Sequence, residues 1–108
     1  MNSPADSTVV RTALWVRLEA RAGQEEALAR FLEGGLDLVR EEPATVSWYA
    51  LRLAPGTFAI FDTFPDAAGR EAHLAGRVAE ALMARAPKLL ARTPAIEPAE
   101  IIAAMLGG

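Results

Sequence analysis

The chain has 108 residues, 52% of them hydrophobic, with 14 acidic and 11 basic side chains and a net charge of −3. This length suits one domain with a modest core. The lack of cysteine excludes disulfide bonds, zinc-finger sites and a thiol nucleophile. The mixed charges lack the basic stripe of a nucleic-acid-binding protein, and no apolar run approaches the roughly 20 residues of a membrane span.

The first eight residues are polar and lack the basic-then-apolar order of a signal peptide. We expect residues 1–8 to be a disordered lead-in, residues 9–106 to form one domain, and the protein to be cytoplasmic. Residues 9–20 alternate in polarity, which predicts a strand. Residues 24–42 change to helical spacing, and Pro43 is expected to end this helix. Its apolar stripe consists of Leu28, Phe31, Leu32, Gly35 and Val39.

Two further strand-like runs, residues 45–54 and 57–64, flank Pro55 and Gly56, whose turn chemistry predicts a β-hairpin. Asp66 is a candidate N-cap for a second helix, expected to bend near Gly76 and continue to residue 86. Pro87 is expected to open a short further helical piece. Residues 95–105 read as a last strand. The order strand, helix, strand, strand, helix, strand predicts an α+β fold of ferredoxin-like βαββαβ type with an antiparallel sheet.

The hairpin register predicts which side chains share a face. Equal arms extended from Pro55 and Gly56 pair Tyr49 with Asp62 and Leu51 with Ile60. Both faces of this hairpin are largely apolar, although two helices can cover only one face of a four-stranded sheet. We therefore expect the other face to pair with a second copy, giving a homodimer whose interface includes Trp15, Trp48 and Phe61. The alternative is that the C-terminal segment covers this face.

Three short segments resemble the antibiotic biosynthesis monooxygenase family. They are Glu42-Pro43-Ala44 before the hairpin, Asp62-Thr63-Phe64 at the end of the third strand, and Glu71-Ala72-His73 with Leu74 on the next helix. In element order and lengths the resemblance spans residues 10–102. It implies a dimeric α/β barrel, in which two sheets pack face to face and each subunit has a small cavity between its sheet and helices.

The resemblance also implies an activity. Enzymes of that family oxidise small aromatic substrates, phenols and quinols, with molecular oxygen, and need no metal, flavin or haem. The chain is therefore expected to be a cofactor-free monooxygenase with no cofactor of its own. The haem-degrading branch uses an Asn-Trp-His set of which two members are missing here, so haem degradation is not expected.

On the equal-armed register, the resemblance suggests that Tyr49, Asp62 and their neighbours face this cavity. His73, the only histidine in the chain, is the candidate general base for a phenolic proton, because histidine titrates near neutral pH. Asp62 is expected to orient or stabilise it, and Tyr49 to hydrogen-bond the substrate. The apolar wall is expected to consist of Phe64, Ile60 and Leu51.

More ordinary interpretations of these residues stay open. His73 could share a solvated stripe with Arg70 and Arg77, Tyr49 could be a core residue, and Asp62 could make a structural hydrogen bond. No cluster of His, Asp or Glu has the spacing of a metal site. The alternative to an enzyme is a non-catalytic dimeric barrel that binds a small apolar ligand or has no pocket. A regulatory ligand-binding domain is a third possibility.

Overall fold

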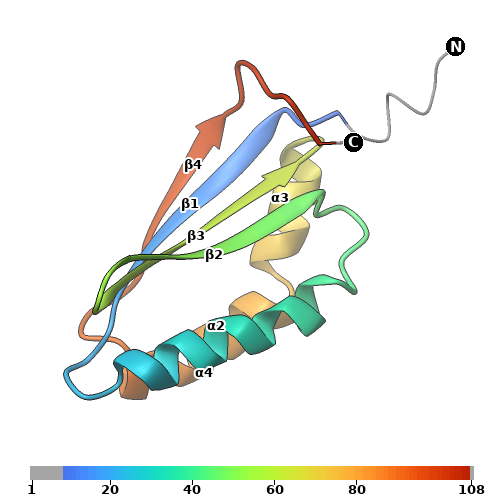
Figure 1. The fold of residues 1–108 in the computed structure, drawn as a ribbon. Coiled ribbons are helices and arrows are strands. Elements are labelled where there is room, and N and C mark those ends of the chain that lie inside the picture. The colour runs from blue at the N-terminus through green and yellow to red at the C-terminus, as the bar shows by residue number, and fades with distance from the viewer. Residues whose placement is uncertain (1–8, 108) are drawn as a thin grey trace, which may run out of the picture.

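The computed structural model describes residues 9–107, which contain one four-stranded antiparallel sheet with its helices on one face (Figure 1). The strands are β1 (Thr12–Glu19), β2 (Ser47–Ala54), β3 (Thr57–Phe64) and β4 (Ala95–Glu100). The helices are α2 (Glu25–Val39), α3 (Ala67–Leu74) and α4 (Arg77–Leu89). The strand order β2-β3-β1-β4 confirms the predicted ferredoxin-like α+β fold. The predicted lead-in, residues 1–8, lies outside the described residues.

Several elements are shorter than predicted. Helix α2 ends at Val39, and the backbone N–H groups of Glu41 and Glu42 close a turn on the carbonyls of Leu38 and Val39. Strand β4 ends at Glu100, where its ladder partner Thr12 begins β1. Pro87 lies inside α4 and does not start a separate piece. The predicted break near Gly76 is correct, because Gly76 is the N-cap between α3 and α4.

The hairpin register differs by one residue from the prediction. Ala54 pairs with Thr57 beside the turn, as equal arms require, but a β-bulge lies between Arg52 and Ala54. Beyond this bulge Trp48 pairs with Asp62 and Tyr49 with Phe61. An extra residue in one strand moves every later side chain of that strand to the opposite face. The predicted pairing of Tyr49 with Asp62 is therefore wrong.

The core lies between the inner face of the sheet and the helices. The predicted stripe of α2 packs there, with Leu28 and Leu32 buried against the sheet. Helices α2 and α4 lie side by side across one end of the sheet, whereas α3 contacts β1 and β3 (Figure 1). The buried cluster consists of Val16, Leu18, Leu28, Leu32, Phe58, Ile60, Leu82, Leu89 and Leu90.

No helix of the described residues covers the opposite face of the sheet (Figure 1). A cross-strand row of Tyr49, Phe61 and Trp15 lies there, because Phe61 pairs with both of the others. The Tyr49 and Phe61 rings are stacked with centroids 6.3 Å apart. We call this row and its neighbours Ala13, Ala59, Leu51 and Thr63 the open face. Within residues 9–107 no helix is both long and apolar enough to cross a bilayer. The cytoplasmic location stays a prediction.

Candidate functional site

Helix α3 places His73 under the sheet. Its N-cap Asp66 accepts a hydrogen bond from the backbone N–H of Gly69 at 2.8 Å, as the sequence predicted. Gly69 also lets α3 approach the loop before β2, since a Cβ there would lie 3.2 Å from the Cβ of Ala44. This close approach brings the last turn of α3, with His73, next to Glu42 of that loop.

His73 is 7% exposed, and a carboxyl group contacts each of its ring nitrogens. Its Nδ1 lies 2.6 Å from Oε1 of Glu42, and its Nε2 lies 2.9 Å from Oδ2 of Asp62. The ring also leans on Phe64, with centroids 5.3 Å apart. His73 is therefore a buried bridge between two carboxyl groups, and it is not part of a solvated stripe.

These contacts set the pKa of His73. Burial by itself lowers the pKa, because it disfavours the charged imidazolium. The contacts with Asp62 and then Glu42 outweigh burial and raise the pKa above its ordinary value of 6.5. The imidazolium form of His73 consequently persists to higher pH than in an ordinary histidine.

Asp62 is fully buried on β3 and has unused acceptor capacity. Its contact with His73 is short but lacks the alignment of a hydrogen bond, so neither carboxyl oxygen has a hydrogen-bond donor among the described residues. The sheet register places Asp62 between Trp48 of β2 and Leu14 of β1. A buried acceptor without a donor is costly, and the His73 ring is the titratable group that contacts this carboxylate.

Glu42 is the site residue that sequence reasoning missed, since the sequence analysis gave it no catalytic or binding role. Its side chain is only 16% exposed. The hydroxyl of Thr45 donates to its Oε1 at 2.7 Å, while its Oε2 is buried without a partner. The one signal in the sequence was the Glu42-Pro43-Ala44 segment, which the family resemblance had already marked.

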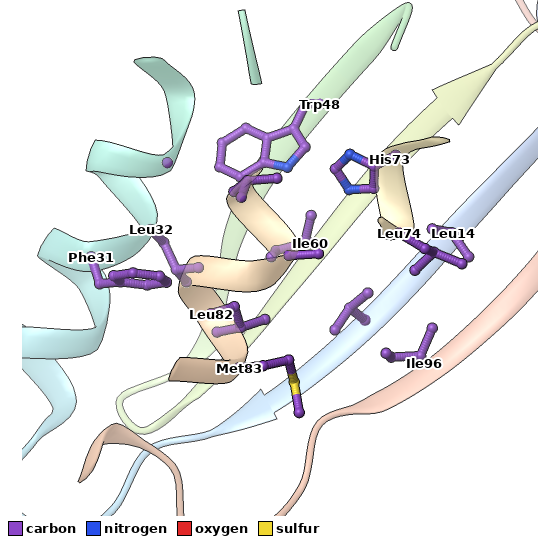
Figure 2. Close-up of a pocket in the computed structure, with 14 residues that line it drawn as sticks. Leu14, Phe31, Leu32, Trp48, Ile60, His73, Leu74, Leu82, Met83 and Ile96 are labelled. Atoms are coloured by element: carbon purple, nitrogen blue, oxygen red, sulfur yellow. The ribbon is translucent and has the colours of Figure 1, made fainter. Parts of the chain in front are cut away.

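An apolar cavity of about 110 Å³ lies between the sheet and the three helices (Figure 2). Its polar lining side chains are His73 and Trp48. The indole Nε1 of Trp48 is buried without a partner and lies on the side of the ring toward His73 (Figure 2). Leu74, Met83 and Ile96 also line the cavity and are partly exposed, so they form its mouth. The remaining lining residues are Leu14, Val16, Phe31, Leu32, Gly35, Ile60, Val78, Ala79 and Leu82.

A second pocket of about 280 Å³ lies on the other side of His73. Glu41, Glu42, Thr45 and Arg77 contribute its polar lining side chains besides His73. His73 thus lines both spaces. Among residues 9–107 no three His, Asp or Glu side chains converge as metal ligands, because Glu42 and Asp62 contact opposite sides of the His73 ring.

The structure brings together only part of the predicted set. Ile60 lines the cavity with His73, and Asp62 and Phe64 contact that histidine. Tyr49 and Leu51, predicted to bind the substrate, lie on the open face instead, and Trp48, predicted for the dimer interface, lines the cavity. All three predicted placements are wrong, because the bulge in β2 moves these side chains to the opposite face of the strand. Trp15 and Phe61 lie on the open face as predicted.

Comparison with known proteins places the chain in a family. No protein-family model and no functionally curated protein matches the sequence. A solved structure, the NE2512 protein of unknown function from Nitrosomonas europaea, is 50% identical and has a TM-score of 0.91. The match covers 94% of this chain and 98% of that one. The chain belongs to the NE2512 family.

More distant structures share the fold of the NE2512 family. The PA3566 protein from Pseudomonas aeruginosa is 20% identical, with a TM-score of 0.75 over 89% of this chain and 98% of its own. A protein described as an antibiotic biosynthesis monooxygenase is 13% identical, with a TM-score of 0.73 over 85% of this chain and 99% of its own. At these identities the likeness establishes a common fold, and the fold resemblance expected from the sequence is confirmed.

Proposed function

We propose that the chain is a cofactor-free monooxygenase that oxidises a single-ring phenol or quinol with molecular oxygen. The observation that carries this proposal is the position of His73, a buried titratable group at the polar end of an otherwise apolar cavity. Such a combination is typical of a small-molecule site. The fold shared with an antibiotic biosynthesis monooxygenase is in keeping with this chemistry.

The cavity volume limits the substrate. Engineered apolar cavities of about 150 Å³ bind benzene, so a cavity of about 110 Å³ has room for at most one aromatic ring within its walls. The partly exposed mouth at Met83 and Ile96 leaves room for a ring substituent to reach solvent. The apolar wall contacts the aromatic ring of the substrate, and the phenolic hydroxyl lies at the polar end of the cavity.

Trp48 and His73 supply the polar contacts. The unpartnered indole N–H of Trp48 can donate to the phenolic oxygen, which would satisfy a buried donor. His73 in its neutral form takes the phenolic proton. Asp62 then stabilises the imidazolium at 2.9 Å. The substrate is left as a phenolate in a dry pocket, where its electron-rich ring is easily oxidised.

The remaining steps balance without a further co-reactant. The phenolate gives one electron to oxygen, forming a phenoxyl radical and superoxide, which combine at the para carbon as a peroxide anion. The imidazolium of His73 returns its proton to this anion, which gives a hydroperoxide and restores the neutral imidazole. Loss of the para proton and cleavage of the O–O bond release water and leave a quinone. One phenol and one oxygen molecule thus give one quinone and one water.

The open face supports a homodimer as part of this proposal. Tyr49, Phe61 and Trp15 form an aromatic row without a covering element among residues 9–107, and an exposed apolar patch of this kind is typical of an interface. A second copy stacked on this face would bury the row and give the dimeric barrel expected from the sequence.

The test is oxygen uptake with a panel of single-ring phenols and quinols, corrected for oxidation without enzyme. We expect uptake by the wild type and a loss of about 100-fold or more in His73→Gln, the lower range for a general base. Tyr49→Phe is the control, since Tyr49 lies on the open face, and it should retain activity. Phenol binding without any oxygen uptake would instead favour the non-catalytic ligand-binding barrel.

A further inference from the structure

We infer that the substrate carries a carboxylate on a short arm, which leaves the cavity past Met83 and binds to Arg21 and Arg92 outside the mouth. This inference rests on the proposed function and narrows its substrate from any single-ring phenol to a phenol with an acidic arm. It concerns the outer end of the site, where no reacting atom lies.

A groove adjoins the mouth of the cavity. Its volume is about 300 Å³, and Met83 lines both the groove and the cavity. Met83 lies at the end of the cavity away from Trp48 and His73 (Figure 2). A phenol with its hydroxyl at the polar end would therefore extend a ring substituent past Met83 into this groove. We call it the basic groove, and its lining residues are Arg21, Met83, Ala86, Pro87, Leu90, Ala91, Arg92, Thr93 and Pro94.

Both charged side chains of the basic groove are arginines. Arg21 donates from Nη2 to the carbonyl oxygen of Pro87 at 2.8 Å, which holds its guanidinium group at the wall of the groove. Neither Arg21 nor Arg92 forms an ion pair with a carboxylate of residues 9–107. Two positive charges thus meet at the place where a substituent would leave the cavity.

Glu19, the acid on which Arg92 has an electrostatic effect, is engaged by other groups. Its carboxylate accepts a hydrogen bond from the Thr57 hydroxyl at 2.8 Å and pairs with Arg17 at 3.3 Å. The hydrogen bond from Thr57 is the largest of the contacts that lower the pKa of Glu19, and the effect of Arg92 is the smallest. Arg92 therefore keeps its capacity to bind an anion.

The chain segment that contributes most of the mouth is basic. Residues 81–96 include Met83 and Ile96, and they contain three basic residues and no acidic residue, although the whole chain has a net charge of −3. Basic side chains near the end of α4 are also favoured by the helix dipole. Arg92 lies beyond the C-cap Leu90 of that helix, so the helix does not account for this charge.

A carboxylate is the substituent that suits the basic groove. A guanidinium group is planar and presents paired donors that match the two oxygens of a carboxylate. The groove is open to solvent, so the gain in affinity is expected to be modest. The proposed reaction removes a hydrogen from the para carbon of the ring, so the arm must be attached at the ortho or meta position.

The test compares meta-hydroxyphenylpropanoate with its amide, which has nearly the same shape and no charge. In calorimetric titration at low salt we expect the wild type to bind the acid about three- to tenfold more tightly than the amide. About 0.5 M salt should reduce this preference, because exposed charges are screened. Arg92→Gln should lose most of the preference. Arg40→Gln is the matched control and should retain it, since Arg40 is the C-cap of α2 and does not line the groove.

Arg21→Gln should also weaken the preference for the acid. Circular dichroism checks that this variant is folded, because it loses the hydrogen bond to Pro87 as well. Equal affinity for acid and amide in the wild type, no binding of either, or an unchanged preference in both arginine variants would overturn the inference. A preference for the acid without oxygen uptake would support the basic groove while the proposed function fails. Oxygen uptake with equal affinity would do the reverse.

Discussion

Gly76 leaves the space that the carboxyl group of Glu42 occupies: a Cβ at this position would lie 2.9 Å from Oε2 of Glu42. That separation is too short for an undistorted contact, so one of the two groups would have to move. The glutamate end is flexible and is the group expected to yield. The helix junction at Gly76 therefore controls the contact between Glu42 and His73.

Replacing Gly76 with alanine should displace Glu42 and weaken one of the two contacts that raise the pKa of His73. We expect the pKa of His73 to fall toward its ordinary value, measured by NMR titration of the single imidazole. Alanine is also a poorer N-cap than glycine, so a stability loss of about 1 kcal/mol is expected. An unchanged titration curve would contradict this account of Gly76.

Gly34→Ala is the control for Gly76→Ala, because it is also a glycine-to-alanine substitution. Gly34 lies exposed within α2, and a Cβ there meets nothing within 4 Å. Alanine in a helix interior is about 1 kcal/mol more favourable than glycine. Gly34→Ala should therefore raise the free energy of unfolding by roughly 0.5–1 kcal/mol in urea titrations and leave the His73 titration unaffected. A destabilised Gly34→Ala protein would show that α2 is not a free helix surface at this point.

The raised pKa of His73 also predicts how stability depends on pH. A group whose pKa is higher in the folded state stabilises the fold fully below its unfolded pKa, and this contribution is lost as pH rises through the folded pKa. The difference in unfolding free energy between the wild type and His73→Gln should therefore be larger at about pH 6 than at about pH 9. Urea unfolding at both pH values measures it, and a constant difference would refute the linkage.

The same pKa direction predicts the pH profile of the proposed reaction. The base must be neutral to accept the phenolic proton, so kcat/KM should rise with pH through a pKa above the ordinary 6.5 of histidine. In Glu42→Gln this rise should move to lower pH, because one contact that favours the imidazolium is weakened. A rise at or below pH 6.5 in the wild type would exclude His73, as placed here, from the role of base.

Cavity size should determine ligand size. Leu82 lines the cavity and is largely buried, and truncation to alanine removes three carbon atoms from its wall. Leu82→Ala should cost about 2–5 kcal/mol of stability and admit a two-ring phenol such as 2-naphthol, which the wild type should reject. Calorimetric titration with phenol and 2-naphthol separates the two cases. Equal binding of both by the wild type would contradict the single-ring limit.

The open face should carry the dimer contact. Phe61→Asp places a charge in the middle of the aromatic row, and burying it against a second copy would be strongly unfavourable. We expect light scattering to give the mass of a dimer for the wild type and of a monomer for this variant. Leu36→Asp is the control, because Leu36 is a partly exposed leucine of α2, away from the open face. A monomeric wild type would remove the dimer from the proposal.

Local signals predicted the position of α3 well. Asp66 caps the helix as its sequence context indicates, and the break between α3 and α4 occurs at Gly76, where the glycine predicted it. These features were enough to place His73 near the end of β3. Strand order followed from the order of the elements, because a split βαβ arrangement has few alternatives.

The contacts of the site could not be predicted in the same way. The bulge at Leu53 contains no glycine or proline that would have predicted it. It places Tyr49 and Trp48 each on the face opposite to the one expected. The contact between Glu42 and His73 joins residues 31 positions apart. It depends on the close approach of Gly69 to Ala44, which only the folded chain reveals.

The bulge in β2 has a consequence for how the hairpin can evolve. Residues 47–52 keep their pairing with β3 whether or not Leu53 is present, because the bulge absorbs the one residue by which the two arms differ. A lineage that loses Leu53 would obtain an equal-armed hairpin with Trp48 still in the cavity and Tyr49 still on the open face. Loss of this one residue from the arm of the hairpin should thus leave both surfaces of the sheet intact.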